Sequence, residues 1–192
     1  MRKTDTKGKI LDAAQDCIQR VGANAMSYQD ISEAVGIQKA SIHYHFATKE
    51  RLIEALIDRY SERFFSLVQS IVESELSPET KLRRYGLLFE AMLSEGERGK
   101  VCLCGILGAE LATLSPVAVD NIRRFFRENE KRLAEVLDEG RRQGVFQFEG
   151  DSRSMATLMF SLLEGAMLVV RADEGTQRFS AIMRQMIKLI SA

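Results

Sequence analysis

Both histidines of the chain, His43 and His45, lie in one short segment on either side of Tyr44. Two imidazoles this close in sequence could ligate a metal ion or transfer protons. The periodicity places them on a helix that begins near Gln38 and reaches Phe46, where residues two apart point about 200° away from each other. They therefore cannot bind the same ion, and no Cys, Asp or Glu stands at ligand spacing on this helix. We expect neither a metal ion nor a cofactor.

The outer face of the same helix suits a nucleic acid. Ile42 and Phe46 are four residues apart and share the inner face, whereas Ala40 and Tyr44 point to solvent. A small residue permits close approach to DNA, and the polar and aromatic residues beside it can reach base edges and phosphates. This pattern predicts a recognition helix that enters the major groove. His45 leans toward the core, and we interpret it as structural.

The element before this helix completes the motif. Ser27 is a predicted N-cap with Asp30 three residues later, and Gly36 ends the short helix that follows. A helix, a tight turn and a second helix predict a helix-turn-helix. The alternative is a helical hairpin without a partner, which would not explain why the cap, the turn and the outward face agree.

The rest of the sequence is also helical. The chain has 192 residues and no net charge, and every long segment has helical periodicity. The Ser-Pro pairs at 77–78 and 115–116 each put a cap before a proline at the first helical position. We predict an all-α protein of nine helices, with a three-helix helix-turn-helix head over residues 1–47 and a six-helix body over residues 48–192.

Two helices are predicted in more detail. In the first, the expected buried stripe consists of Ile10, Ala14, Cys17 and Val21. Between the two Ser-Pro pairs, a single helix is expected over about residues 101–113.

The composition disfavours several classes of protein. The most apolar run, residues 154–170, is shorter than about 20 residues and contains Glu164, which favours a buried helix over a membrane span. The basic N-terminus becomes amphipathic rather than apolar, so we do not expect a signal peptide. Three cysteines give no disulfide framework and suit the reducing cytoplasm. No phosphate loop or hydrolase motif is present, so we expect no enzyme. A purely structural helical dimer is the other alternative.

The segment MSYQDISEAVGIQKASIHYHFATKERL, residues 26–52, resembles the DNA-binding segment of the TetR family of transcriptional repressors. The shared features are the Ser27 cap, the turn at 34–37, the recognition helix from 39, its aromatic end at 43–46 and the helix start at 48–52. His43 is a departure, because the family more often has Tyr there. The chain length and the number of helices extend the resemblance to the whole chain.

This resemblance implies a homodimer that binds a palindromic double-stranded DNA operator and releases it when a small molecule enters the helical body. By the same analogy, the residues that hold phosphates would be Ser27, Tyr28, Lys39, Tyr44 and Lys49. The residues nearest the bases would be Gln38, Lys39, Ser41 and His43, with Ala40 allowing close approach.

Two C-terminal segments carry apolar residues on nearly every side, so they must be covered on more than one face. In the family, the last two helices of each subunit form a four-helix dimer interface. We therefore predict a dimer interface that includes Leu158, Leu162, Met167, Ile182 and Met186. The alternative is that these residues form an ordinary core within one chain.

The effector pocket is predicted among the aromatic and sulfur-containing residues of the body. The candidate residues are Phe64, Tyr85, Phe89, Met92, Cys102, Phe125 and Phe126. The alternative is that this stripe is plain hydrophobic core.

The segment VCLCGILGAELA, residues 101–112, offers a second kind of control. Cys102 is expected near a helix N-terminus beside Lys100 and Arg98, where thiolates form more easily. The segment is also similar to that of a TetR branch that senses electrophiles or reactive chlorine through this cysteine, with Glu110 matching a glutamate of that branch. Cys102 and Cys104 are therefore candidate redox residues, and the alternative is that both are buried core residues. The overall prediction is a cytoplasmic, ligand-released repressor, with a thiol sensor acting through Cys102 as the alternative.

Overall fold

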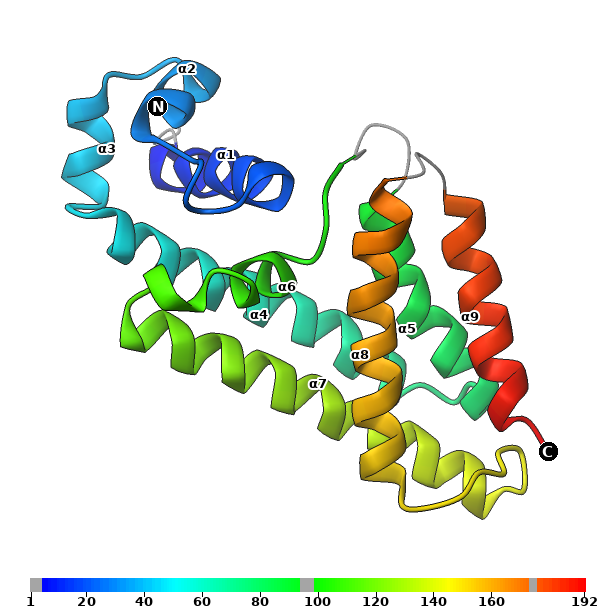
Figure 1. Ribbon diagram of the computed structural model, residues 1–192. Coiled ribbons are helices and arrows are strands. Elements are labelled where there is room, and N and C mark those ends of the chain that lie inside the picture. Colours follow the sequence, from blue (N-terminus) through cyan, green and yellow to red (C-terminus); the bar gives the residue numbers. More distant parts are fainter. Residues whose placement is uncertain (1–4, 94–98, 173–175) are drawn as a thin grey trace. The chain divides into compact units, whose positions relative to one another are not determined.

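The computed structural model describes residues 5–93, 99–172 and 176–192. This described part contains nine α-helices, one short 3-10 helix and an isolated bridge between Phe146 and Ser191, which confirms the all-α prediction (Figure 1). The helices are α1 (Thr6–Val21), α2 (Tyr28–Val35), α3 (Lys39–His45), α4 (Lys49–Val72), α5 (Pro78–Met92), α6 (Leu103–Gly108), the 3-10 helix η1 (Leu111–Thr113), α7 (Pro116–Arg142), α8 (Ser152–Arg171) and α9 (Thr176–Ile190).

The chain folds into two compact units. The first contains the chain up to Ser61 together with Leu103–Arg123, and the second contains Glu62–Cys102 and Arg124–Ala192. These units differ from the predicted head (residues 1–47) and body (residues 48–192), which remain a prediction of functional domains. The first half of α4, all of α6 and the start of α7 belong with the helix-turn-helix, because α6 packs on α1. Such a contact between distant parts of the chain leaves no local signal in the sequence.

The buried side of α1 differs in part from the predicted stripe. Ile10, Ala14 and Ile18 are buried, whereas Val21 is 55% exposed and Cys17 is half-buried. The predicted stripe stepped three residues from Ala14 to Cys17, but the observed stripe steps four residues each time. Both steps keep residues near one face of a helix, so periodicity alone did not choose between them.

Capping residues start the later helices where predicted. The Ser77 hydroxyl accepts a hydrogen bond from the Thr80 N–H at 3.3 Å, and the Ser115 hydroxyl accepts one from the Ala118 N–H at 3.2 Å. Asp151 caps α8 by accepting a hydrogen bond from the Ser154 N–H at 2.8 Å. The helix expected over residues 101–113 is shorter than predicted, because α6 ends at Gly108 and η1 follows separately.

In the second unit, α5 packs against α8 and α9 (Figure 1). α5 and α9 pack tightly at Gly86, where an added Cβ would lie 2.1 Å from Met183 Cε. α8 is long and apolar enough to cross a membrane by length and composition. In this fold one side of α8 is buried within the unit, as Met159, Leu163 and Met167 show.

Candidate functional site

The helix α2 is fixed at both ends by its own sequence. Ser27 and Asp30 form a capping box, in which the Ser27 N–H donates to Asp30 Oδ2 at 2.7 Å and the Asp30 N–H donates to Ser27 Oγ at 3.4 Å. The hydrogen bond from the Ser27 backbone is the main cause that lowers the pKa of Asp30. Gly36 ends α2 with φ at 72°, in the left-handed region. The turn into α3 is therefore determined locally.

The predicted inner and outer faces of α3 are confirmed. Ile42 and Phe46 are buried, whereas Lys39 and Ala40 are exposed. Tyr44 is 87% exposed, which is unusual for a large aromatic side chain. A short helix that presents a cation, a small residue and an aromatic ring on one solvent face has the chemistry needed to contact DNA.

Several of the predicted phosphate or base contacts, among them Tyr28, His43 and Lys49, also form contacts within the motif. The Tyr28 hydroxyl donates to the Phe46 carbonyl at 3.1 Å, and the rings of Tyr28 and His43 lie 4.8 Å apart. Lys49 Nζ donates to the Met26 carbonyl at 2.6 Å. These contacts link α2, α3 and α4 in one arrangement, a role that the sequence prediction missed.

The remaining polar residues of α3 differ in exposure. Gln38 and His43 are exposed, whereas Ser41 and His45 are half-buried. The His45 ring lies edge-on to Tyr44, with 5.2 Å between the ring centroids, so the two histidines have different neighbours. Within the described residues, no group of three or more His, Cys, Asp or Glu could hold a metal ion.

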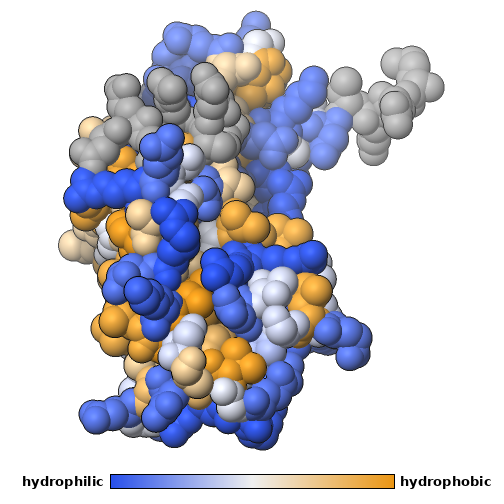
Figure 2. Space-filling view, turned by 90° about the vertical axis from the view of Figure 1, so that its right-hand side faces the viewer, coloured by the Kyte–Doolittle hydropathy of each residue, from blue (hydrophilic) through white to orange (hydrophobic). Residues whose placement is uncertain are grey.

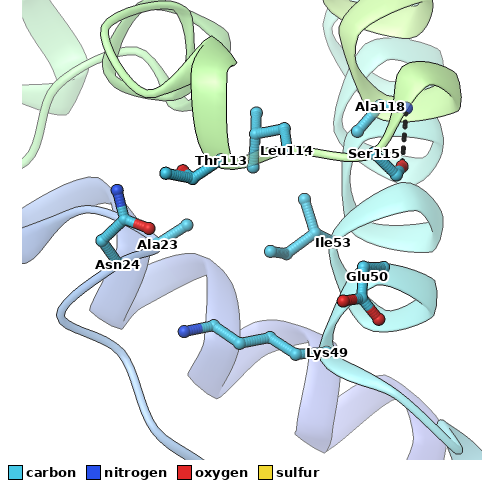
Figure 3. A pocket seen from close by; sticks show the side chains of 9 residues that line it. All are labelled: Ala23, Asn24, Lys49, Glu50, Ile53, Thr113, Leu114, Ser115 and Ala118. Atoms are coloured by element: carbon cyan, nitrogen blue, oxygen red, sulfur yellow. Dashed lines mark hydrogen bonds between the residues drawn. The ribbon is translucent and has the colours of Figure 1, made fainter.

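A small hollow of about 90 Å³ lies in the first unit beside the helix-turn-helix (Figure 3). The residues that line it come from the turn after α1, from α4 and from the segment that leads into α7: Ala23, Asn24, Lys49, Glu50, Ile53, Thr113, Leu114, Ser115 and Ala118. Ligand sites for organic molecules usually exceed roughly 300 Å³. This hollow is therefore a gap between packed elements and not a site for an effector of that size.

Glu110 connects the end of α6 to the turn after α1. Its Oε2 accepts a hydrogen bond from the Ala23 N–H at 2.7 Å, and the Asn24 N–H lies 3.3 Å from each carboxylate oxygen. The approach is so close that a Cβ at Gly22 would lie 2.5 Å from Glu110 Oε1. These backbone N–H groups follow the end of α1 and precede α2, so the carboxylate helps to fix where the helix-turn-helix begins.

The aromatic residues of the predicted effector pocket lie together in the second unit, but they are packed against one another. The Phe64 ring lies 6.5 Å from Tyr85, 5.7 Å from Phe89 and 5.4 Å from Phe125, which are ordinary aromatic packing distances. Phe160, which the prediction missed, lies 6.3 Å from Phe89. Phe126 and Met92 are half-buried. We call the following residues the aromatic cluster: Phe64, Phe65, Tyr85, Phe89, Phe125, Phe126 and Phe160.

Two buried polar groups sit within this cluster and hydrogen-bond to each other. The Tyr85 hydroxyl donates to Asn129 Oδ1 at 3.0 Å, and Asn129 Nδ2 donates to the Phe125 carbonyl at 2.9 Å. Burial raises the pKa of Tyr85 well above its usual value, so this hydroxyl stays protonated. The cluster therefore contains a buried hydrogen-bonded pair as well as aromatic rings, and it is not a purely apolar core.

The two candidate redox cysteines are both buried. Cys102 hydrogen-bonds to Glu164 of α8, and Cys104 lies within α6. The sequence prediction placed Cys102 beside Arg98, which lies outside the described residues. It did not anticipate Glu164, whose carboxylate would oppose a negative charge on the neighbouring sulfur.

The predicted dimer-interface residues do not share one surface. Met167 and Met186 are buried within the second unit, so they belong to its core and cannot form the surface of an interface. Leu158 is 63% exposed, Leu162 is 42% exposed and Ile182 is half-buried. The exposed apolar residues of α8 and α9 are Leu158, Leu162, Leu168, Val169 and Leu189. Hydrophobic and hydrophilic side chains alternate over the side of the molecule that Figure 2 shows.

Comparison with known proteins agrees with this arrangement. The model of the bacterial regulatory proteins of the tetR family matches residues 10–56, and the model of the tetracyclin repressor-like C-terminal domain matches residues 78–186. The nucleoid occlusion factor SlmA of Vibrio atlanticus is 25% identical over 94% of this chain and 93% of its own length.

Solved structures show the same architecture. A TetR-family transcriptional regulator from Agrobacterium tumefaciens is 34% identical, with a TM-score of 0.90 over 96% of this chain and 97% of that chain. A TetR transcriptional regulator from Legionella pneumophila is 28% identical, with a TM-score of 0.88 over the full length of both chains. With the helix-turn-helix and the helical body both matched, the chain belongs to the TetR family of DNA-binding transcriptional regulators.

Proposed function

We propose that this regulator is a cytoplasmic repressor that binds a palindromic DNA operator as a homodimer and leaves it when a small molecule enters the aromatic cluster. The observation that carries the proposal is the outer face of α3. Lys39, Ala40 and Tyr44 are exposed there, while Ile42 and Phe46 anchor the opposite face in the core.

On the operator, α3 would lie in the major groove with its N-terminal end nearest the bases. Gln38, Lys39, Ser41 and His43 are the proposed base-proximal residues. Ser27, Tyr28, Lys39, Tyr44 and Lys49 are the proposed phosphate contacts. The internal bonds of Tyr28 and Lys49 support this assignment, because groups held in place lose less conformational freedom on binding.

Dimerisation would use the exposed apolar residues of α8 and α9. Leu158, Leu162, Leu168 and Val169 follow helical spacing along α8 and are all at least 42% exposed. An apolar row of this kind in a soluble protein usually marks an interaction surface. A two-fold dimer would also match the two half-sites of a palindromic operator.

A small molecule would act by separating the packed rings of the aromatic cluster. Four helices contribute to the cluster, namely α4, α5, α7 and α8. α4 and α7 each begin in the first unit and end in the second. A change in their second-unit ends can therefore reach the helix-turn-helix through continuous helices.

The second candidate mechanism is a thiol sensor acting through Cys102. The hydrogen bond between Cys102 and Glu164 favours it, since a carboxylate can accept the thiol proton as an electrophile reacts with sulfur. Cys102 directly precedes α6, so a group added there would disturb the helix that ends near Glu110.

The test is a gel-shift titration on the DNA upstream of the protein's own gene, with reduced protein and with protein treated with a thiol-modifying electrophile. Cys102→Ser is the matched variant. We expect a specific shift whose affinity falls with salt at a slope near −0.9 per phosphate contacted. If the electrophile abolishes the shift of the wild type but not of Cys102→Ser, the thiol mechanism replaces the ligand mechanism. If the protein gives no specific shift with this DNA or with any other DNA tested, the repressor proposal is refuted.

A further inference from the structure

Glu164 is a half-buried acidic residue that has no role in the proposed DNA binding or dimerisation. It lies on α8, and its Oε1 atom is sealed from solvent. Phe160 precedes it by four residues, so the two side chains lie on the same side of α8. Through Phe160, which lies 5.9 Å from Phe126 and 6.3 Å from Phe89, this carboxylate borders the aromatic cluster.

The hydrogen bonding of Glu164 is incomplete. Cys102 provides one hydrogen bond, but Oε1 has no hydrogen-bond partner, and no described Lys, Arg or His forms an ion pair with this carboxylate. An ionised carboxylate can accept about four hydrogen bonds. Buried acceptors without partners are rare and costly, so this oxygen calls for a donor that the described residues do not supply.

Tyr85 and Asn129 do not supply that donor. The Tyr85 hydroxyl on α5 is close enough for Glu164 to affect its pKa, but it donates to Asn129. Asn129 on α7 donates to a backbone carbonyl. Both of these donors therefore already have an acceptor.

The aromatic cluster already accommodates one cation at its edge. The Arg132 guanidinium lies 4.6 Å from the centre of the Phe65 ring, and Phe65 stacks on Phe125 at 5.4 Å. Arg132 also bonds to Glu128 at 2.9 Å, so its charge is balanced on its own helix. Ring faces attract cations, most strongly where water is excluded.

We infer that Glu164 is the anchor for an apolar amine in its protonated form, with the ammonium group bonded to Oε1 and the apolar part held among the rings of the cluster. This inference rests on the proposed function, since it names the chemical class of the effector. The ammonium would supply both the missing donor and the missing positive charge, and the rings would replace part of its hydration.

Binding of this kind would alter the packing of the second unit. The rings of the cluster are in contact, so the apolar part of the amine must separate them. The helices that carry these rings would shift by an amount that depends on the size of the apolar group. An amine without an apolar part would bind weakly and would not release the operator.

The inference is tested by isothermal titration calorimetry of the full-length protein with phenylbutylamine, phenylbutanol and phenylbutyrate, which share an apolar part and differ in charge. We expect the amine to bind at least about tenfold more tightly than the alcohol, as a charge-assisted buried bond provides. Glu164→Gln should remove this preference and leave binding of the alcohol unchanged. The exposed Glu149→Gln is the matched control and should bind like the wild type.

Equal affinities for the amine and the alcohol, undiminished amine binding by Glu164→Gln, or no binding of any of the three compounds would each overturn the inference. Operator binding, measured on the same preparations, keeps the two proposals apart. A protein that binds its operator but prefers the alcohol or the acid refutes the amine site alone. A protein that prefers the amine through Glu164 but binds no operator refutes the repressor proposal alone.

Discussion

Glu164 is an acid that the fold makes costly to ionise. Burial raises its pKa from 4.5 to about 7, and the hydrogen bond from Cys102 opposes only part of this rise. The folded chain therefore keeps the Glu164 proton at pH values where the unfolded chain has lost it. The stability that this provides is complete below about pH 4.5 and is lost as the pH rises through about 7.

Glu164→Gln should consequently be more stable than the wild type at alkaline pH. The expected difference in the free energy of unfolding reaches up to about 3 kcal/mol above pH 7 and disappears near pH 4. Urea unfolding of both proteins at several pH values measures it. A difference that does not vary with pH would show that Glu164 does not titrate as its burial requires.

Lys39 is the exposed cation of the recognition helix. Lys39→Ala should weaken operator binding and reduce the slope of log affinity against log salt by about 1, because one phosphate contact is lost. Fluorescence anisotropy with labelled operator at several salt concentrations measures both effects. Lys131 is an exposed lysine on α7, and Lys131→Ala should change neither the affinity nor the salt slope. A salt slope of Lys39→Ala equal to that of the wild type would exclude the phosphate contact.

At the scale of elements, Glu110 determines how firmly the start of the helix-turn-helix is held. Glu110→Ala removes the acceptor for the Ala23 and Asn24 N–H groups, whereas Glu110→Gln retains an uncharged acceptor. A hydrogen bond to a charged group contributes about 1.5–3 kcal/mol. We therefore expect faster hydrogen exchange at these two amides and weaker operator binding, with Gln intermediate.

Amide exchange followed by NMR tests this directly, because it reports on Ala23 and Asn24 individually. Glu33→Ala, which removes an exposed carboxylate from α2, should leave both amides as protected as in the wild type. If Glu110→Ala also leaves them protected, Glu110 does not hold this turn.

Gly36 is required by the backbone of the turn between α2 and α3. Its φ is 72°, and an added Cβ would meet nothing within 4 Å, so only backbone strain opposes a side chain here. Gly36→Ala should cost about 1 kcal/mol in the free energy of unfolding. Gly36→Asn should cost less, because Asn tolerates the left-handed region. Urea unfolding of the wild type and the two variants measures these differences. An equal loss of unfolding free energy in Gly36→Ala and Gly36→Asn would contradict this explanation.

The elements that could be predicted are those with local signals. The cap at Ser27, the left-handed Gly36 and the proline at 78 each act within a few residues, and all three lie where the sequence placed them. The contact of Glu110 with Ala23 and that of Glu164 with Cys102 join residues far apart in sequence. Such contacts depend on tertiary packing, which periodicity does not encode.

The predicted dimer interface was wrong in part, because a helix that is apolar on nearly every side can be covered by its own chain or by a partner. Met167 and Met186 were expected at an interface, since a helix that is apolar all round must be covered on every side. Periodicity cannot tell which side is covered by the chain itself. The structure buries these two methionines, whereas Leu158 and Leu162 of the same predicted interface are exposed.

At the scale of the whole molecule, the proposed dimer depends on the exposed leucines of α8. Leu158→Glu combined with Leu162→Glu should convert the dimer into a monomer, because burying two carboxylates in an apolar interface is costly. Sedimentation equilibrium measures the change in mass. Leu87→Glu places the same charge on the exposed side of α5 and is the control. A double variant that stays dimeric would locate the interface elsewhere.

The monomer should also bind operator DNA poorly. Two recognition helices reach two half-sites only when the subunits are joined, and one half-site provides a fraction of the contacts. Fluorescence anisotropy measures the affinity of the wild type and of the monomeric variant for the full operator and for a half operator. Equal affinity of the monomeric variant and the wild type for the full operator would contradict a dimeric mode of binding.

The most direct test of the central claim is a selection of bound sequences from random double-stranded DNA. The wild type is compared with a variant that carries both Lys39→Ala and Tyr44→Ala, which changes only exposed residues of α3. We predict that the wild type enriches a palindromic sequence and that the variant, although folded, does not. If the wild type enriches no sequence, or if the variant enriches the same sequence, α3 does not recognise an operator through its exposed face.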